Sequence, residues 1–284
     1  MLPTIDYKQI KSGIIDSHAH LLLEYCADGP DELDCKSLER FKEDQRQVIQ
    51  RSVDVNVKQI VNPGVDLQSI PELMDLADQH EQIYIAVGLH PHNAKDWTQE
   101  AERSLRKAAE HPKVVGIGEC GLDFYYNNSS PESQVNALRA QMRIAKELNK
   151  PLIIHCRDAF DQLKGLLGEE GNGLKGVLHC FTGDPQILSS FEEFDLYVSF
   201  SGIVTFPNAK NVQAAAKVAR RERLLVETDC PYLAPQKVRG KKNEPAYVWM
   251  VAEKLAELRE ASLADIARTC CDNARTLFKL PEVG

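Results

Sequence analysis

Short runs of branched apolar residues alternate with longer amphipathic stretches along most of this chain. The apolar runs are the length of strands, and there are eight of them, at residues 13–20, 57–64, 83–91, 114–123, 151–158, 176–183, 196–204 and 224–233. Between these runs, apolar residues recur at spacings of three and four, which is typical of helices with one buried face. The alternation predicts eight successive strand–helix units.

The predicted helices follow the strands in turn, at residues 39–55, 68–80, 99–111, 132–149, 158–168, 185–194, 211–222 and 246–260. A ninth helix is expected at 262–278, where Ser262, with Asp265 three residues later, is a favourable N-cap. Strands that alternate with helices form a parallel sheet, and eight such units are expected to close into a barrel. The chain is therefore predicted to be α/β, a single TIM (β/α)8 barrel domain over residues 1–284 with an extra C-terminal helix.

A doubly wound open sheet is the alternative fold. No G-x-G-x-x-G or G-x-x-x-x-G-K-[ST] segment follows the first predicted strand. Such a segment would be needed to hold the phosphates of a nucleotide at that point. The barrel is therefore favoured.

Histidines and acids gather where the predicted strands end. Six of the eight histidines lie there, and the ends carry His18, His20, His90, His92, Glu119, His155, His179 and Asp229. In a barrel of parallel strands these ends share one face, which is where the active sites of such enzymes lie. His18 and His20 are two residues apart on a strand, so their side chains are expected to point the same way.

Each of these residues alone has an ordinary interpretation. A histidine at a strand end is usually a hydrogen-bonded residue, His90 begins a Pro-containing turn, and Asp229 could cap the next element. Together, however, four imidazoles and two carboxylates in one barrel mouth would be poorly compensated unless cations lay among them. The predicted metal ligands are His18, His20, Glu119, His155, His179 and Asp229.

Six ligands of this kind are more than one cation needs, and they suit two divalent cations per chain. Glu119, on a middle strand, is expected to bridge a first metal at His18, His20 and Asp229 and a second metal at the remaining two histidines. Two cations about 3.5–4 Å apart can share a water molecule and lower its pKa towards about 7. Glu119 and Asp229 are thus the predicted catalytic residues, with Asp229 orienting the hydroxide or accepting its proton.

Four cysteines directly follow predicted ligands, namely Cys120, Cys156, Cys180 and Cys230. Because adjacent residues on a strand face opposite ways, these thiols are expected to point into the apolar layer between barrel and helices. The alternative is that the thiolates are the ligands, but the chain has no C-x-x-C pair.

Several blocks of the chain look like those of one known family, in that family's order. They are "DSHAHL", "VGLHPH", "GIGECGLDFY", "PLIIHCRDA", "HCFTG", "SFSGIVTF", "ETDCPYLAP" and "RGKKNEPAYV". From about Gly13 to the C-terminus, the chain resembles the TatD family of metal-dependent deoxyribonucleases. The resemblance implies a TIM barrel that hydrolyses DNA phosphodiesters with divalent cations, as a 3′ to 5′ exonuclease on single strands. The family's metal positions fall on the six residues predicted above.

Two features depart from that family's pattern. Ala19 stands where the family often has Cys, and the acidic segment 23–41 is longer than the family's usual link after the first strand. The segment is expected on the active-site side, where it could narrow the choice of substrate. The native cation stays open: imidazoles favour zinc or manganese, whereas the resemblance implies that magnesium is tolerated.

The formal net charge is −8, so the chain cannot attract nucleic acid by its overall charge. Local groups must hold a polyanion. The predicted substrate-binding residues are His90 and Arg157 near the scissile phosphate and, in the loop after the last strand, Lys237, Arg239, Lys241 and Lys242. DNA, as single strands or frayed ends, is the expected partner, with RNA as an alternative.

The remaining expectations concern location and competing functions. No apolar run is long enough to cross a membrane, and no N-terminal signal is evident, so we expect a cytoplasmic protein without an obligate protein partner. Eight cysteines without paired spacing fit reduced thiols. The competing functions are a small-molecule amidohydrolase or phosphotriesterase, and a non-catalytic metal-binding interaction module.

Overall fold

The computed structural model of the protein describes residues 6–22 and 35–282, with side chains for all of these except 35–41. The segment 23–41, which we expected on the active-site side, therefore lies largely outside the described residues. Every strand and α-helix of the described ranges lies between Ile14 and Phe278.

Eight parallel strands form one sheet in sequential order, β1-β2-β3-β4-β5-β6-β7-β8. The strands are β1 (Ile14–Asp16), β2 (Val57–Pro63), β3 (Ile83–Val87), β4 (Val114–Asp123), β5 (Leu152–Arg157), β6 (Gly176–Leu178), β7 (Tyr197–Phe200) and β8 (Leu224–Val226). The ends of the sheet meet because the Ser17 N–H donates to the Val226 carbonyl at 3.2 Å. The Thr228 N–H also donates to the Asp16 carboxylate at 2.9 Å. The predicted barrel is confirmed. A doubly wound open sheet is excluded, because the order of its strands reverses part-way across the sheet, whereas here the order is sequential from β1 to β8.

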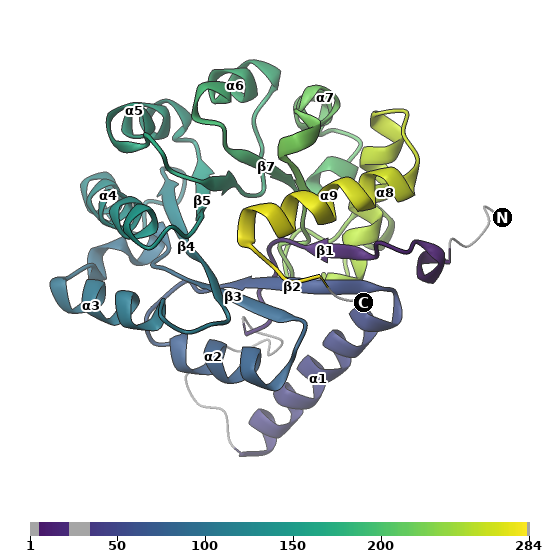
Figure 1. Ribbon diagram of the computed structural model, residues 1–284, viewed down its shortest axis with the longest axis horizontal. Helices are drawn as coiled ribbons and strands as arrows, with labels where there is room; N and C mark the ends of the chain where they lie inside the picture. Colours follow the sequence, from purple (N-terminus) through teal and green to yellow (C-terminus); the bar gives the residue numbers. More distant parts are fainter. Residues whose placement is uncertain (1–5, 23–34, 283–284) are drawn as a thin grey trace.

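Helices follow the strands and surround the barrel (Figure 1). They are α1 (Cys35–Asp54), α2 (Ile70–Gln79), α3 (Gln99–Ala108), α4 (Pro131–Glu147), α5 (Phe160–Glu170), α6 (Pro185–Ser190), α7 (Lys210–Val218), α8 (Val248–Leu258) and α9 (Leu263–Phe278). The helix predicted at 185–194 is shorter than expected. It ends at Ser190 with Phe191 as its C-cap, and a 3-10 turn, η4 (Glu192–Phe194), leads to Asp195 with a left-handed φ of 53°.

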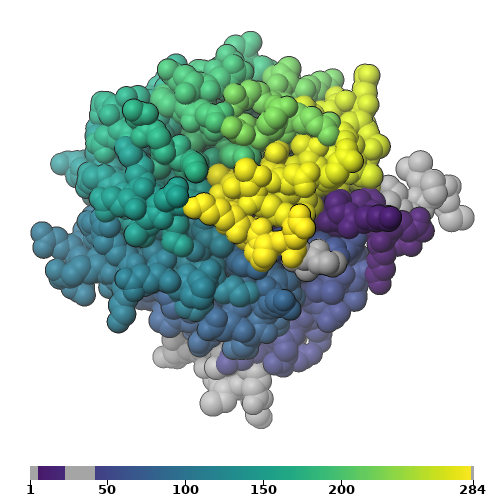
Figure 2. Space-filling model, viewed as in Figure 1, coloured from purple at the N-terminus to yellow at the C-terminus, as the bar shows by residue number. Residues whose placement is uncertain are grey.

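The extra C-terminal helix α9 closes one end of the barrel. Its Ser262 N-cap accepts a hydrogen bond from the Asp265 N–H, as the sequence predicted. Apolar side chains of α9, among them Leu277 and Phe278, pack against residues early in the strands, such as Val115 and Leu225. Figure 1 shows α9 crossing the ring of strands, and Figure 2 shows the C-terminal segment covering the centre of that face. The opposite end of the barrel, at the carboxyl ends of the strands, is not covered by α9.

A larger apolar layer lies between the strands and the helices, with side chains such as Ile60, Leu73, Met142 and Trp249. This layer holds each strand against its helix and so sets where the strand ends lie. No helix in the described ranges has the length and apolar character needed to cross a bilayer.

Candidate active site

A cavity of about 800 Å³ opens at the carboxyl ends of the strands. Five of the six predicted ligands line it: His20 follows β1, Glu119 lies in β4, His155 lies in β5, His179 follows β6 and Asp229 follows β8. The sixth, His18, is fully buried and stacks on His179, with ring centroids 3.9 Å apart. The structure therefore brings all six residues to one end of the barrel.

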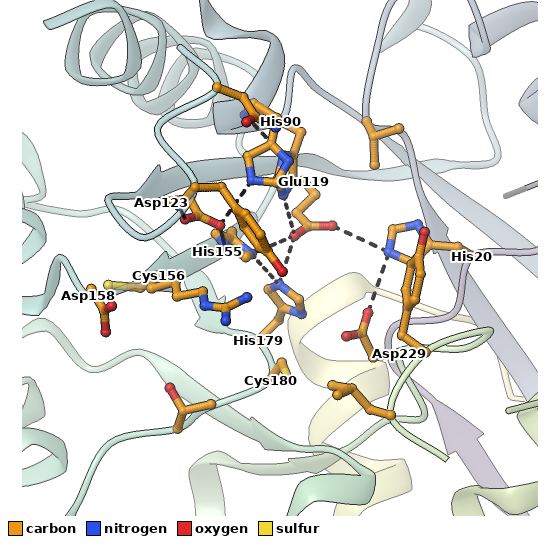
Figure 3. Close-up of a pocket in the computed structure, with 18 of the residues that line it drawn as sticks. His20, His90, Glu119, Asp123, His155, Cys156, Asp158, His179, Cys180 and Asp229 are labelled. Carbon is orange, nitrogen blue, oxygen red and sulfur yellow. Dashed lines mark hydrogen bonds and ion pairs between the residues drawn. The ribbon is translucent and has the colours of Figure 1, made fainter. Parts of the chain in front are cut away.

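The Glu119 carboxylate lies at the centre of this cluster (Figure 3). Its Oε1 lies 3.0 Å from His155 Nδ1, 2.9 Å from His179 Nε2 and 3.3 Å from His90 Nε2. Its Oε2 faces the other way, 3.3 Å from His18 Nε2 and 3.5 Å from His20 Nε2. The two oxygens of one carboxylate thus serve two separate groups of histidines.

Asp229 completes the group around Oε2. Its Oδ1 lies 3.6 Å from His18 Nε2 and 3.5 Å from His20 Nε2. The backbone of Asp229 is left-handed, with φ 57°, and its N–H donates to the His18 carbonyl at 2.9 Å. Asp229 is therefore held in register with the end of β1 across the closure of the barrel.

The donor atoms fit divalent cations. His18 Nε2 and His20 Nε2 face each other at 3.1 Å, and both face carboxylate oxygens. The buried Nδ1 atoms of the same two histidines have no hydrogen-bond partner. Three groups of ligand atoms lie within 4.8 Å of one another, and they are His18–His20–Glu119, His90–Glu119–His155 and His18–His179–Glu227. Converging imidazole nitrogens and carboxylate oxygens are ligands that zinc, manganese and related cations take.

Burial and charge act against each other in this cluster. Burial would raise the pKa of the Glu119 carboxyl, but the imidazoles of His179 and His90 hold it well below its usual range. Burial lowers the pKa of His90 to about 4, against the opposing effect of the Glu119 charge. His90 is therefore neutral at pH 7, with a lone pair available to a cation.

Two buried glutamines on α4 hold the strand ends that carry these residues. The Gln141 side chain accepts from the Leu89 N–H at 2.8 Å and donates to the Leu89 carbonyl at 3.1 Å, next to His90. The Gln134 side chain accepts from the Asp123 N–H at 2.7 Å and donates to the Asp123 carbonyl at 3.0 Å. Because the two glutamines are seven residues apart, they share one face of the helix.

Asp123 is a site residue to which the sequence analysis gave no role. Its Oδ2 lies 3.1 Å from His155 Nε2 and 3.0 Å from His92 Nε2. Asp123 is four residues after Glu119 in β4, so both side chains fall on the same face of the strand. That spacing could have revealed it.

Glu227 was also missed. It is fully buried, and its Oε1 lies 3.3 Å from His179 Nδ1, whereas its Oε2 has no hydrogen-bond partner. Glu227 precedes Asp229 by two residues, which repeats the spacing of His18 and His20. β8 ends at Val226 and Asp229 has a left-handed φ of 57°, so strand alternation does not extend to this second pair.

The predicted substrate-binding residues fall into two groups. His90 and Arg157 line the cavity. His90 also contacts Glu119, with Nε2 3.3 Å from Oε1, so it belongs to the ligand cluster as well as to the predicted phosphate site. The loop residues Lys237, Arg239, Lys241 and Lys242 are exposed, and none of them lines the cavity. Lys237 Nζ lies 2.7 Å from Glu253 on α8, and the Arg239 guanidinium lies over the Phe206 ring at 5.2 Å. The role of the loop stays a prediction.

The expectation for the cysteines is partly right. Cys120 and Cys230 are buried in the apolar layer, and Cys156 packs against that layer but also lines the cavity. Cys180 lines the cavity. β6 ends at Leu178 and Cys180 has a left-handed φ of 44°, so strand alternation does not extend to it. The pairing of β5 with β6 ends at Ile154, whereas β5 itself continues to Arg157. Cys156 therefore lies on a part of β5 that β6 does not flank. The six described cysteines form no disulfide.

A closed eight-stranded α/β barrel with histidines and carboxylates converging at its carboxyl end is an arrangement suited to a metal-dependent hydrolase. A family model described as "TatD related DNase" matches residues 15–279. The chain belongs to this family, as its sequence blocks indicated.

Individual relatives support this family assignment. A Bacillus subtilis (strain 168) protein named "Uncharacterized metal-dependent hydrolase YabD" is 39% identical over 268 residues, which cover 94% of this chain and 99% of that protein. The Escherichia coli (strain K12) protein named "3'-5' ssDNA/RNA exonuclease TatD" is 35% identical over 245 residues, covering 84% of this chain and 94% of that protein. The crystal structure of YJJV, a TatD homologue from Escherichia coli K12, superposes with a TM-score of 0.83 at 28% identity, covering 96% and 100% of the two chains.

Proposed function

We propose that the protein cleaves phosphodiester bonds in DNA, as a 3′ to 5′ exonuclease on single strands, with two divalent cations bridged by Glu119. The observation that carries this proposal is the central carboxylate, whose two oxygens each face a separate group of histidines. A bridging carboxylate between two histidine groups is the arrangement expected of a two-metal hydrolytic site. The name of the Escherichia coli relative supports the choice of substrate.

We assign His18, His20 and Asp229 to a first cation, and His155 and His179 to a second, with Glu119 shared. His90 is added to the second group because its Nε2 lies beside the same Glu119 oxygen as His155. When bound, divalent cations would acidify a water molecule and neutralise charge on the phosphate. The chain's own residues then have to hold the strand and accept the proton.

Asp229 is the proposed proton acceptor. Its side chain is 14% exposed, whereas that of Glu119 is 4% exposed, so Asp229 reaches further into the cavity. Water attacks the phosphorus, its proton passes to Asp229, and the bond from phosphorus to the 3′ oxygen of the shortened strand breaks. That oxygen leaves with the electron pair of the bond and takes up a proton from solvent water. The products are a nucleoside 5′-monophosphate and a strand one residue shorter, with a 3′ hydroxyl.

Arg157 is the proposed contact for phosphate in the cavity, and Lys237, Arg239, Lys241 and Lys242 are proposed to follow the strand beyond it. The protein carries a net charge of −8, so these cations have to supply the attraction locally. RNA, which differs at the 2′ hydroxyl, is an alternative substrate for the same phosphate chemistry.

Digestion of end-labelled single-stranded DNA by metal-reconstituted protein tests this function, with RNA and small amide and ester substrates beside it. A 5′-labelled strand should give a ladder of shortened products, and a 3′-labelled strand should release labelled mononucleotide at once. Cleavage of the amide or ester substrates alone would favour a small-molecule amidohydrolase. The absence of any hydrolysis would favour a metal-binding module.

A further inference from the structure

Two adjacent tyrosines are exposed beside the cavity. Tyr125 is 58% exposed and Tyr126 is 55% exposed, and Tyr126 lines the cavity. Their rings are nearly perpendicular, with an interplanar angle of 88° and centroids 4.9 Å apart. Aromatic surface of this size is normally buried in a folded protein, so its exposure at a cavity mouth suggests a ligand.

The Arg157 guanidinium lies in the angle between these rings. Its central carbon is 4.0 Å from the centroid of Tyr125 and 4.8 Å from that of Tyr126. No hydrogen bond or ion pair joins this guanidinium to any other residue in the described ranges, although the protein has a net charge of −8. A cation held between rings and left without a carboxylate partner is available to an anion.

One carboxylate connects the tyrosines to the centre of the site. Asp123 Oδ1 accepts hydrogen bonds from the backbone N–H groups of Tyr125 at 3.0 Å and Tyr126 at 2.9 Å. Asp123 Oδ2 lies 3.1 Å from His155 Nε2, and Nδ1 of the same imidazole lies 3.0 Å from Glu119 Oε1. Asp123 is 1% exposed, so it ties the backbone that carries both tyrosines to the hydrolytic centre.

We propose that Tyr125, Tyr126 and Arg157 form a binding site for the nucleotide next to the scissile phosphate, which we call the tyrosine–arginine platform. Arg157 binds a phosphate of the strand, and an exposed tyrosine ring stacks on the neighbouring base. This assignment rests on the proposed nuclease function. Bases inside a duplex have both faces covered by their neighbours, so the platform selects unpaired ends.

The test compares two labelled strands of equal length and charge, one intact and one whose terminal nucleotide is an abasic tetrahydrofuran analogue, which keeps the sugar ring and lacks the base. Tyr125→Ala and Tyr126→Ala should raise KM for the intact strand by roughly 5- to 150-fold at the position that stacks, the range expected for loss of one stacked base. KM for the abasic strand should change far less. Tyr→Phe at the same position should restore the affinity, because the ring is retained.

A spectroscopic measurement separates stacking from other causes. A strand with terminal 2-aminopurine should lose fluorescence on rapid mixing with the unmodified protein, before cleavage, and this quenching should disappear in the alanine variant. Val218→Ala is the matched control, because Val218 is 62% exposed and does not line the cavity. It should leave both readouts unchanged.

The outcomes are distinguishable. If the unmodified protein cleaves neither strand, the nuclease function fails and the platform with it. If it cleaves both strands but neither alanine variant discriminates between them or loses the quenching, the platform alone is wrong.

Discussion

At the scale of single residues, the site depends on one carboxylate shared by two groups of histidines. Glu119→Gln keeps the shape of the side chain but removes the charge that faces five imidazoles. We expect turnover to fall by more than about 100-fold, since loss of even an outer partner of a metal ligand costs about 10- to 100-fold. Circular dichroism should show an intact barrel, and the exposed Glu110→Gln should serve as an active control. A fully active Glu119→Gln protein would refute the bridging role.

Asp229 contacts the first group of histidines and also reaches the cavity. If it accepts the proton of the attacking water, Asp229→Asn should lower kcat by about 100- to 10,000-fold, the usual contribution of a general base. KM should change little in steady-state kinetics. A raised KM with retained kcat would instead make Asp229 a substrate-binding residue.

Some of these residues were predictable from spacing alone, and others were not. The two-residue spacing of His18 and His20 correctly predicted that their side chains converge, and their Nε2 atoms lie 3.1 Å apart. The same spacing relates Glu227 to Asp229, but an acid in a buried run gives no indication of its partner. Cys180 was misplaced because its left-handed backbone interrupts the alternation of the strand.

At the scale of elements, α4 fixes the ends of β3 and β4 through buried glutamines. Gln141→Leu would leave the buried N–H and carbonyl of Leu89 without partners, at a cost of about 1–3 kcal/mol for each group. We expect a lower free energy of unfolding in denaturant titrations and reduced turnover, because His90 follows Leu89 directly. Gln162→Leu, at an exposed position of α5, is the matched control. Equal free energies of unfolding for the two variants would show that the hydrogen bonds between Gln141 and Leu89 are dispensable.

The order and type of the elements were predictable because strand and helix periods differ clearly along the chain. All eight strands and all nine α-helices of the described ranges overlap the predicted segments. The exceptions are local. Residues 185–194 carry a helical pattern, yet the α-helix ends at Ser190 and the chain continues as a 3-10 turn to Asp195, whose left-handed backbone stops it. The hydrogen bonds from Gln134 and Gln141 to the strand ends were not predictable, since they depend on which strand ends face α4.

At the scale of the whole molecule, the proposed function requires a chain with net charge −8 to hold a polyanion. Phosphates outside the cavity need local cations, for which we propose Lys237, Arg239, Lys241 and Lys242. Replacing all four with alanine should weaken oligonucleotide binding, most strongly at low salt, and should make its salt dependence shallower because fewer counterions are released. Hydrolysis of a small phosphodiester should hardly change.

A charge-matched control separates the loop from a general electrostatic effect. Alanine at Lys11, Lys107, Lys175 and Lys217 removes the same charge from exposed positions that do not line the cavity. This control should retain the salt slope of the unmodified protein. If the two quadruple variants have the same oligonucleotide affinity and the same salt slope, the nucleic-acid strand does not follow this loop.

The measurement that tests the central claim most directly is the metal content of the protein. After loading with manganese or zinc and removal of excess ion, elemental analysis should approach two cations per chain, because Glu119 presents its two oxygens to separate groups of ligands. The Glu119→Gln variant should retain fewer. One cation or none in fully active protein would contradict the two-metal centre.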